Sequence, residues 1–180
     1  MPRDNDPAHL HPQFRALALE LTARCGSEGL PITLYEGARS PWRQAELYAR
    51  GRTTGTRGKT VTRARAWESK HQYGVAADFV FRVEGRWSWD EPQAGMWNTF
   101  HGLAYGCGLQ VLKFEKPHVE LPTHLMVLQA GKVPEGDASW SWWYESEIER
   151  WGQSSREIDG IVHPGAPPLP IERPDLEEVA

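Results

Sequence analysis

Hydrophobic residues recur at helical spacing in several segments of the chain. In residues 11–26 they lie three or four positions apart, with a proline near the start and a glycine at the end, which predicts a helix. Residues 41–50 begin with a proline and follow Ser40, a favoured N-cap residue. Residues 96–107 place their large apolar side chains on one helical face and stop at a glycine. We therefore predict three helices, and a fourth over the tryptophan-rich residues 139–152 that packs on the core.

Short apolar runs between these helices predict strands. Residues 30–37 indicate a buried strand, and residues 75–89 alternate like a hairpin that turns at Glu84 and Gly85. Residues 109–121 form a further strand region. Because the chain has 180 residues, of which 39% are hydrophobic, it can bury one core of ordinary size, and we expect one compact domain.

Two segments have compositions that do not favour a packed element. Residues 51–66 combine cations, glycines and hydroxyls, which indicates a surface loop able to cover a cleft. Residues 161–180 are rich in proline and acid, so we expect an extended or disordered tail. The predicted division is therefore a domain over residues 1–160, including the tryptophan-rich segment, and a tail over residues 161–180.

Charge and hydropathy narrow the classes of partner. A net charge of -4 and a pI near 6.0 give no global reason to expect nucleic acid or an acidic membrane. No apolar run approaches the roughly 20 residues that span a bilayer, and the N-terminus has no apolar signal-peptide core. We expect synthesis in the cytoplasm, without a signal peptide or a membrane span. Cys25 and Cys107 suit buried free thiols better than a disulfide or a metal pair.

The stretch SKHQYGVAADF, residues 69–79, carries the first candidate chemistry. Asp78 lies among apolar residues of a predicted strand, where an ionised carboxylate costs several kcal/mol unless it meets a cation or a metal. His71 lies on the preceding turn, and Gly74 lets the backbone double back, so both side chains can converge on one point. The alternatives are a turn histidine bonded to backbone and an ion pair between Asp78 and an arginine such as Arg39.

The stretch FEKPHVEL, residues 114–121, offers the second half of a site. Pro117 disfavours helix before it, so Glu115 and His118 are not arranged as in a helical HExxH zinc motif. In a strand, His118 and Glu120 share one face, and His118 can supply a third ligand. Two histidines and one carboxylate with an open position are the ligands of a catalytic zinc. Glu115 beside them can act as general base in the hydrolysis of an amide.

Three motifs of the chain resemble a known family. SKHQYGVAADF matches S-x-H-x-x-G-x-A-x-D, EKPHVE is similar to a second motif with an acidic residue three positions before a histidine, and GARSPWRQAELYARGRT looks like the strand, turn and helix that open the fold. Together they resemble the zinc peptidoglycan peptidases, which include D-alanyl-D-alanine carboxypeptidases and phage L-alanyl-D-glutamate endopeptidases. The motifs occur in the family's order over about half of the chain.

The resemblance implies a fold, a cofactor and a set of roles. The fold would be a small α+β domain, with helices on one face of a short antiparallel sheet and Zn²⁺ in a groove on the other. The implied roles are metal ligands for His71, Asp78 and His118, general base for Glu115, substrate or oxyanion binding for Arg39, and a hydrogen bond beside the substrate for Ser69.

The implied substrate is the stem peptide of peptidoglycan, cut at the L-alanyl-D-glutamate bond by a monomeric enzyme. It would act at the cell wall as a phage endolysin after release, or as part of a phage particle. The alternatives are a D,D-carboxypeptidase of the same family and a non-catalytic zinc-containing module that binds the wall. Two features depart from the family pattern. The segment before the second motif is short, and glutamate stands at 115 where many phage enzymes of this type have aspartate.

Overall fold

The computed structural model describes residues 2–53 and 58–169. Its helices are α1 (Pro12–Ser27), α2 (Pro41–Ala49), α3 (Met96–Gly106), α4 (Leu125–Gln129) and α5 (Ala138–Trp151), with 3-10 turns η1 (Pro7–His9) and η2 (Lys70–Tyr73). Its strands are β1 (Ile32–Glu36), β2 (Ala76–Val83), β3 (Arg86–Ser88), β4 (Gln110–Leu112), β5 (Glu115–Glu120), β6 (Arg156–Ile158) and β7 (Ile161–His163).

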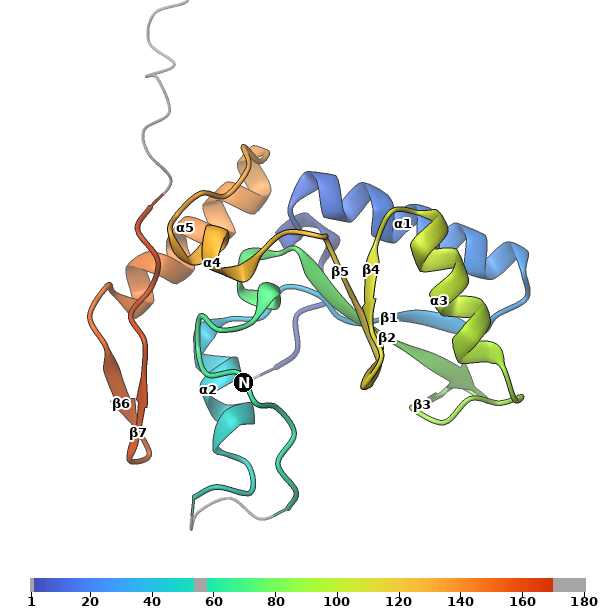
Figure 1. The fold of residues 1–180 in the computed structure, drawn as a ribbon, viewed down its shortest axis with the longest axis horizontal. Coiled ribbons are helices and arrows are strands. Elements are labelled where there is room, and N and C mark those ends of the chain that lie inside the picture. The colour runs from blue at the N-terminus through green and yellow to red at the C-terminus, as the bar shows by residue number, and fades with distance from the viewer. Residues whose placement is uncertain (1, 54–57, 170–180) are drawn as a thin grey trace, which may run out of the picture.

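One antiparallel sheet forms the centre of the molecule (Figure 1). Its strand order is β1-β2-β5-β4, and β3 pairs with the far half of β2. Helices α1 and α3 lie side by side on one side of this sheet (Figure 1). The fold is therefore the predicted small α+β domain. Among the described residues, no helix is long and apolar enough to cross a membrane.

The alternation along β2 divides the sheet into a core face and a site face. Phe79 packs on Phe100 of α3 with ring centroids 5.5 Å apart, and Phe81 packs on Trp97 at 4.6 Å. Asp78 points to the opposite face because successive side chains of a strand alternate. The predicted helices and the hairpin that turns at Glu84 are confirmed, so the sequence pattern correctly oriented the strand that carries Asp78.

The register of the sheet brings residues from distant parts of the chain together. Asp78 lies opposite His118 of β5 on one side and opposite Glu36 of β1 on the other, where β1 contains a bulge. Residues 109–121, predicted as one strand region, form the β4–β5 hairpin. The predicted alternation of residues between the two faces of this strand is confirmed, because Val119 is fully buried in the core while His118 points to the site face.

The C-terminal part of the described chain packs more extensively than its composition predicts. Helix α5 buries Trp140 and Trp151, so the tryptophan-rich segment is a packed helix, as predicted. Strands β6 and β7 then form a separate hairpin, after which Ala166 is buried. The packed structure thus extends past the predicted domain boundary at residue 160. The part of the predicted tail from residue 170 onward lies outside the described residues.

The two cysteines are both free and buried, as predicted. Cys25 belongs to α1, and Cys107 caps the end of α3. Burial raises the pKa of the Cys25 thiol to about 11, so this group remains a protonated, apolar part of the core at neutral pH.

Candidate active site

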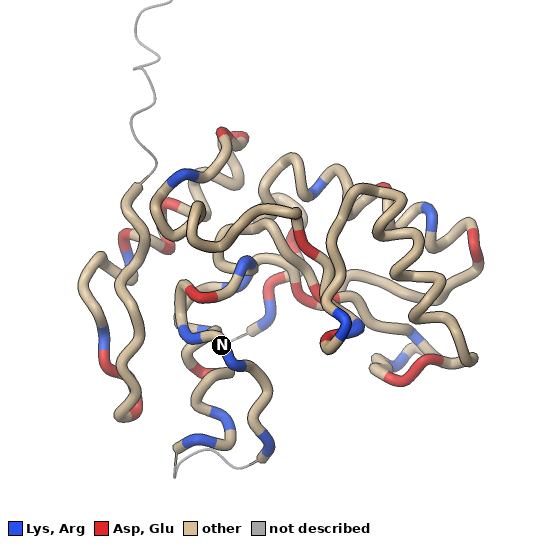
Figure 2. Tube along the Cα trace, in the orientation of Figure 1, with Lys and Arg blue, Asp and Glu red and all other residues tan. Residues whose placement is uncertain are grey.

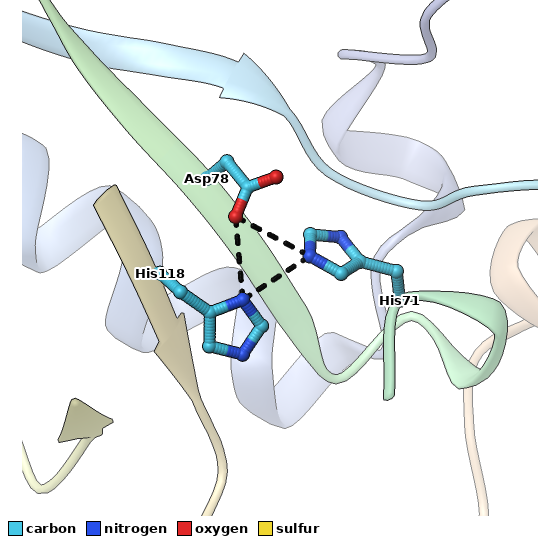
Figure 3. Close-up of side chains that lie close together, drawn as sticks. All are labelled: His71, Asp78 and His118. Carbon is cyan, nitrogen blue, oxygen red and sulfur yellow. Dashed lines mark hydrogen bonds and ion pairs between the residues drawn. The ribbon is translucent and has the colours of Figure 1, made fainter. Parts of the chain in front are cut away.

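Three side chains from two adjacent strands and a turn converge at one point (Figure 3). His71 Nε2 lies 3.3 Å from His118 Nδ1 and 3.4 Å from Asp78 Oδ1, and His118 Nδ1 lies 3.2 Å from the same oxygen. Both histidines are almost fully buried. The structure therefore brings together the three residues that the sequence suggested as metal ligands.

The triangle of donor atoms fits a zinc ion. Zinc bonds of about 2.0–2.1 Å in a tetrahedral arrangement place neighbouring donor atoms roughly 3.3–3.4 Å apart, close to the three distances in this cluster. The opposite ring nitrogen of each histidine is already bonded to a protein acceptor: Gly37 O lies 2.6 Å from His71 Nδ1, and Glu120 Oε2 lies 3.0 Å from His118 Nε2. The nitrogens that face inward are thus available as ligands.

The electrostatics of the cluster also favour a cation. Burial disfavours the charged form of His118, but the carboxylates of Asp78 and Glu120 outweigh it and raise its pKa to about 9. Burial likewise works against the Asp78 carboxylate, but the two histidines and Arg39 hold its pKa well below the usual value. Without a metal, His118 is therefore protonated at neutral pH and its charge balances that of Asp78, and a metal ion that binds Nδ1 would displace this proton.

The turn that carries His71 is fixed by its local structure. The Ser69 N–H donates to Gln72 Oε1 at 3.1 Å, which closes the start of η2. Gly74 ends η2 in the left-handed region, with φ of 67°. A Cβ atom at this position would approach Trp140 Nε1 to 2.7 Å and the His9 carbonyl oxygen to 2.8 Å. Gly74 therefore permits both the reversal of the chain and its close contact with α5.

Arg39 lies between the carboxylates of Glu36 and Asp78 and binds both. Its Nη2 donates to Glu36 Oε2 at 2.7 Å and to Asp78 Oδ2 at 2.9 Å, while Nη1 donates to Gln44 at 3.1 Å. The ion pair between Asp78 and Arg39, considered from the sequence as an alternative to a metal site, is therefore present. It coexists with the cluster because it uses Oδ2, whereas Oδ1 faces the histidines.

The cluster opens into a cleft of about 890 Å³. Ser69, Glu115 and Arg39 line this cleft together with both histidines, so all predicted site residues except the partly buried Asp78 lie on its wall. Glu115 is exposed at the start of β5. Figure 2 shows cations along α2 and the loop that follows it. Arg63 of that loop is exposed, lines the cleft and has no hydrogen bond or ion pair with a described residue.

Two site residues were missed by the sequence reasoning. Glu120 accepts from His118, and the Lys70 ammonium donates to Glu120 Oε1 at 2.8 Å. Burial raises the pKa of the Glu120 carboxyl, but His118 and Lys70 outweigh it and leave the pKa lowered. The signal for Glu120 was available, because it alternates with His118 on one face of the strand. Lys70 gave no signal, because its partner lies fifty positions away.

The chain is similar to known peptidoglycan peptidases. It is 40% identical over 93 residues to the peptidoglycan L-alanyl-D-glutamate endopeptidase CwlK of Bacillus subtilis (strain 168), a match that covers 51% of this chain and 54% of that protein. The chain thus matches about half the length of this relative. No family model matches the sequence.

Three solved structures give partial matches. They are the LD-carboxypeptidase LdcB (27% identity, 62% of this chain, 65% of that chain, TM-score 0.46), the L-Ala D-Glu endopeptidase ChiX of Serratia marcescens (22%, 64%, 83%, 0.41) and the L,D-carboxypeptidase DacB of Streptococcus pneumonia (20%, 87%, 79%, 0.48). The sequence match to CwlK confirms the resemblance to the peptidoglycan peptidases that the motifs predict.

Proposed function

We propose that this chain is a zinc-dependent peptidase that hydrolyses the stem peptide of peptidoglycan, with the L-alanyl-D-glutamate bond as its target. The observation that carries the proposal is the triangle of His71, Asp78 and His118 donor atoms, spaced for zinc at the wall of an open cleft. The similarity to CwlK supports the choice of substrate and bond.

A zinc ion on these three residues would supply a Lewis acid that activates water and polarises the carbonyl of the scissile amide. Glu115 is the proposed general base. Among the described carboxylates that line the cleft, Glu68 is paired with Arg65 and Glu120 with Lys70, whereas Glu115 accepts no hydrogen bond from a described residue. It is therefore free to take a proton from water and to deliver it to the leaving amine.

Arg39 and Arg63 have different proposed roles. Arg39 is buried and its guanidinium binds Glu36 and Asp78, so we assign it the task of holding Asp78 in place. Its contact with substrate stays a prediction from the resemblance. Arg63 is the exposed cation of the cleft wall and suits a carboxylate of the stem peptide. Ser69 lies on the same wall and is the proposed hydrogen-bond donor to the substrate backbone.

The oligomeric state, the place of action and the link to phage are inferred from the family resemblance alone. It predicts a monomer that acts at the cell wall, in phage release or as part of a phage particle. The division into a catalytic domain over residues 1–160 and a tail is likewise a proposal, with the packed part extended to Ala166.

The test is mass spectrometry of the products released when zinc-loaded protein is incubated with purified peptidoglycan. New D-glutamate amino termini are the expected result, whereas loss of a single terminal alanine would identify a carboxypeptidase. Glu115→Gln should retain zinc and lose about 10²–10⁴-fold in kcat. Glu84→Gln, an exposed glutamate on the β2–β3 turn, is the matched control. Zinc binding without cleavage of any wall type would indicate a binding module instead.

A further inference from the structure

Behind His118, on the side away from the metal cluster, lies a largely buried pair of opposite charges. His118 Nε2 is 3.0 Å from Glu120 Oε2, and Lys70 Nζ is 2.8 Å from Glu120 Oε1. Lys70 also donates to the Leu121 carbonyl oxygen at 2.9 Å. We propose that Lys70 and Glu120 are positioning residues that present His118 Nδ1 to the metal and hold the two ligand-bearing elements together. This inference rests on the proposed zinc site.

The two histidines of the cluster must use different ring nitrogens. His71 faces the cluster with Nε2, because its Nδ1–H donates to Gly37 O. His118 faces it with Nδ1. A neutral imidazole has one N–H and one lone pair, so Nδ1 can bind a metal only if the proton is on Nε2. Glu120 supplies the acceptor that keeps the proton there.

Lys70 fixes the orientation of Glu120. The Glu120 side chain is only 11% exposed, and its two oxygens have different partners. Oε1 accepts from the Lys70 ammonium, and Oε2 contacts Nε2 of His118. The ammonium therefore holds the carboxylate where Oε2 can accept the ring N–H.

The position of Lys70 in the chain gives the pair a second effect. Lys70 precedes His71 on η2, whereas Glu120 and the Leu121 carbonyl follow His118 at the end of β5. The ammonium thus ties the turn that carries one ligand to the strand that carries another. The distance between His71 and His118 is therefore fixed by side chains as well as by the sheet.

The experiment compares Glu120→Gln and Lys70→Met with wild type. Zinc affinity is measured by competition with a chromogenic chelator, and the protonated ring nitrogens by ¹H–¹⁵N NMR of the zinc-loaded proteins. We expect a 10–100-fold loss of zinc affinity in Glu120→Gln and a smaller loss in Lys70→Met. The control is Glu68→Gln, which alters another carboxylate of the cleft wall that is paired with an arginine and should bind zinc like wild type.

Wild type should show an Nε2–H proton for His118 and an Nδ1–H proton for His71. Wild-type zinc affinity in both Glu120→Gln and Lys70→Met would overturn the inference, as would zinc on Nε2 of His118 in the native protein. Lys70→Met changes a side chain at the cleft wall, so it tests the pair even if Glu120→Gln does not fold. A protein that binds zinc as described but cuts no peptidoglycan would refute the proposed function and leave this inference standing.

Discussion

Replacing Arg39 with methionine removes the guanidinium that joins two buried carboxylates. Arg39 is 8% exposed, and its partners Glu36 and Asp78 belong to adjacent strands of the sheet. Methionine is shorter but unbranched and apolar, and it fills the space of the arginine stem, so the variant mainly tests the loss of charge and hydrogen bonds. The two carboxylates would then face each other across the sheet without the cation that now separates them.

The expected loss can be worked from these contacts. Removing one partner of a buried ion pair costs about 3–5 kcal/mol. Glu36 would retain Arg43 at 3.1 Å, and Asp78 would retain His118 at 3.2 Å, so the loss should lie near the lower end, at about 3 kcal/mol. With a urea m-value of about 2 kcal/mol/M, the unfolding midpoint of the metal-free protein should fall by roughly 1.5 M.

The assay is urea unfolding followed by tryptophan fluorescence, with zinc affinity measured in parallel. Arg39→Met should lose stability and bind zinc less tightly, because Asp78 Oδ1 is no longer held toward the histidines. Arg39→Met combined with Glu36→Gln should recover part of the stability, because one of the unpaired charges is gone. Arg50→Met is the control, since its pair with Glu46 is exposed and contributes about 0–1 kcal/mol. Unchanged stability together with a raised KM would refute this reasoning and return Arg39 to the substrate-binding role.

Three further predictions concern the turn, the buried acid of α5 and the cleft wall. Gly74→Ala should destabilise the fold by about 2–4 kcal/mol in thermal unfolding and weaken zinc binding, because its Cβ meets Trp140 in a left-handed turn; wild-type stability would contradict it. Burial raises the pKa of Glu147, so folding favours the neutral acid. The stability that the neutral acid gives is lost as pH rises from the ordinary carboxyl pKa through the raised pKa. Glu147→Gln should therefore raise the melting temperature in neutral buffer but not below the ordinary carboxyl pKa, and an equal gain at both would exclude this cause. Arg63→Gln should raise KM about tenfold for stem peptides with a free carboxylate and leave amidated peptides unaffected, whereas an equal rise for both would remove Arg63 from recognition.

The local structure of the chain was largely determined by sequence. Ser40 caps α2 and accepts from the Arg43 N–H at 3.1 Å, as its position before a proline predicts. The period-2 pattern of β2 correctly placed Asp78 on the face opposite Phe79 and Phe81, which pack on α3. These features depend on residues a few positions apart, so local spacing contains the information that they require. Glu120 belongs to this group too, since its alternation with His118 was visible in the sequence.

Only the tertiary structure decided what Arg39 contacts and where the packed chain ends. An arginine at a turn can point into a cleft or toward a neighbouring strand. Arg39 points toward the strands because the register places Glu36 and Asp78 opposite each other, where both carboxylates can bind it. The β6–β7 hairpin is too short to show a periodic pattern, and Ala166 is buried by contacts that its proline-rich surroundings do not predict. The sequence by itself thus determined the types of ligand and the faces on which they lie. The long-range pairing of strands determined their distances, because side chains forty or more positions apart become neighbours only when the sheet forms.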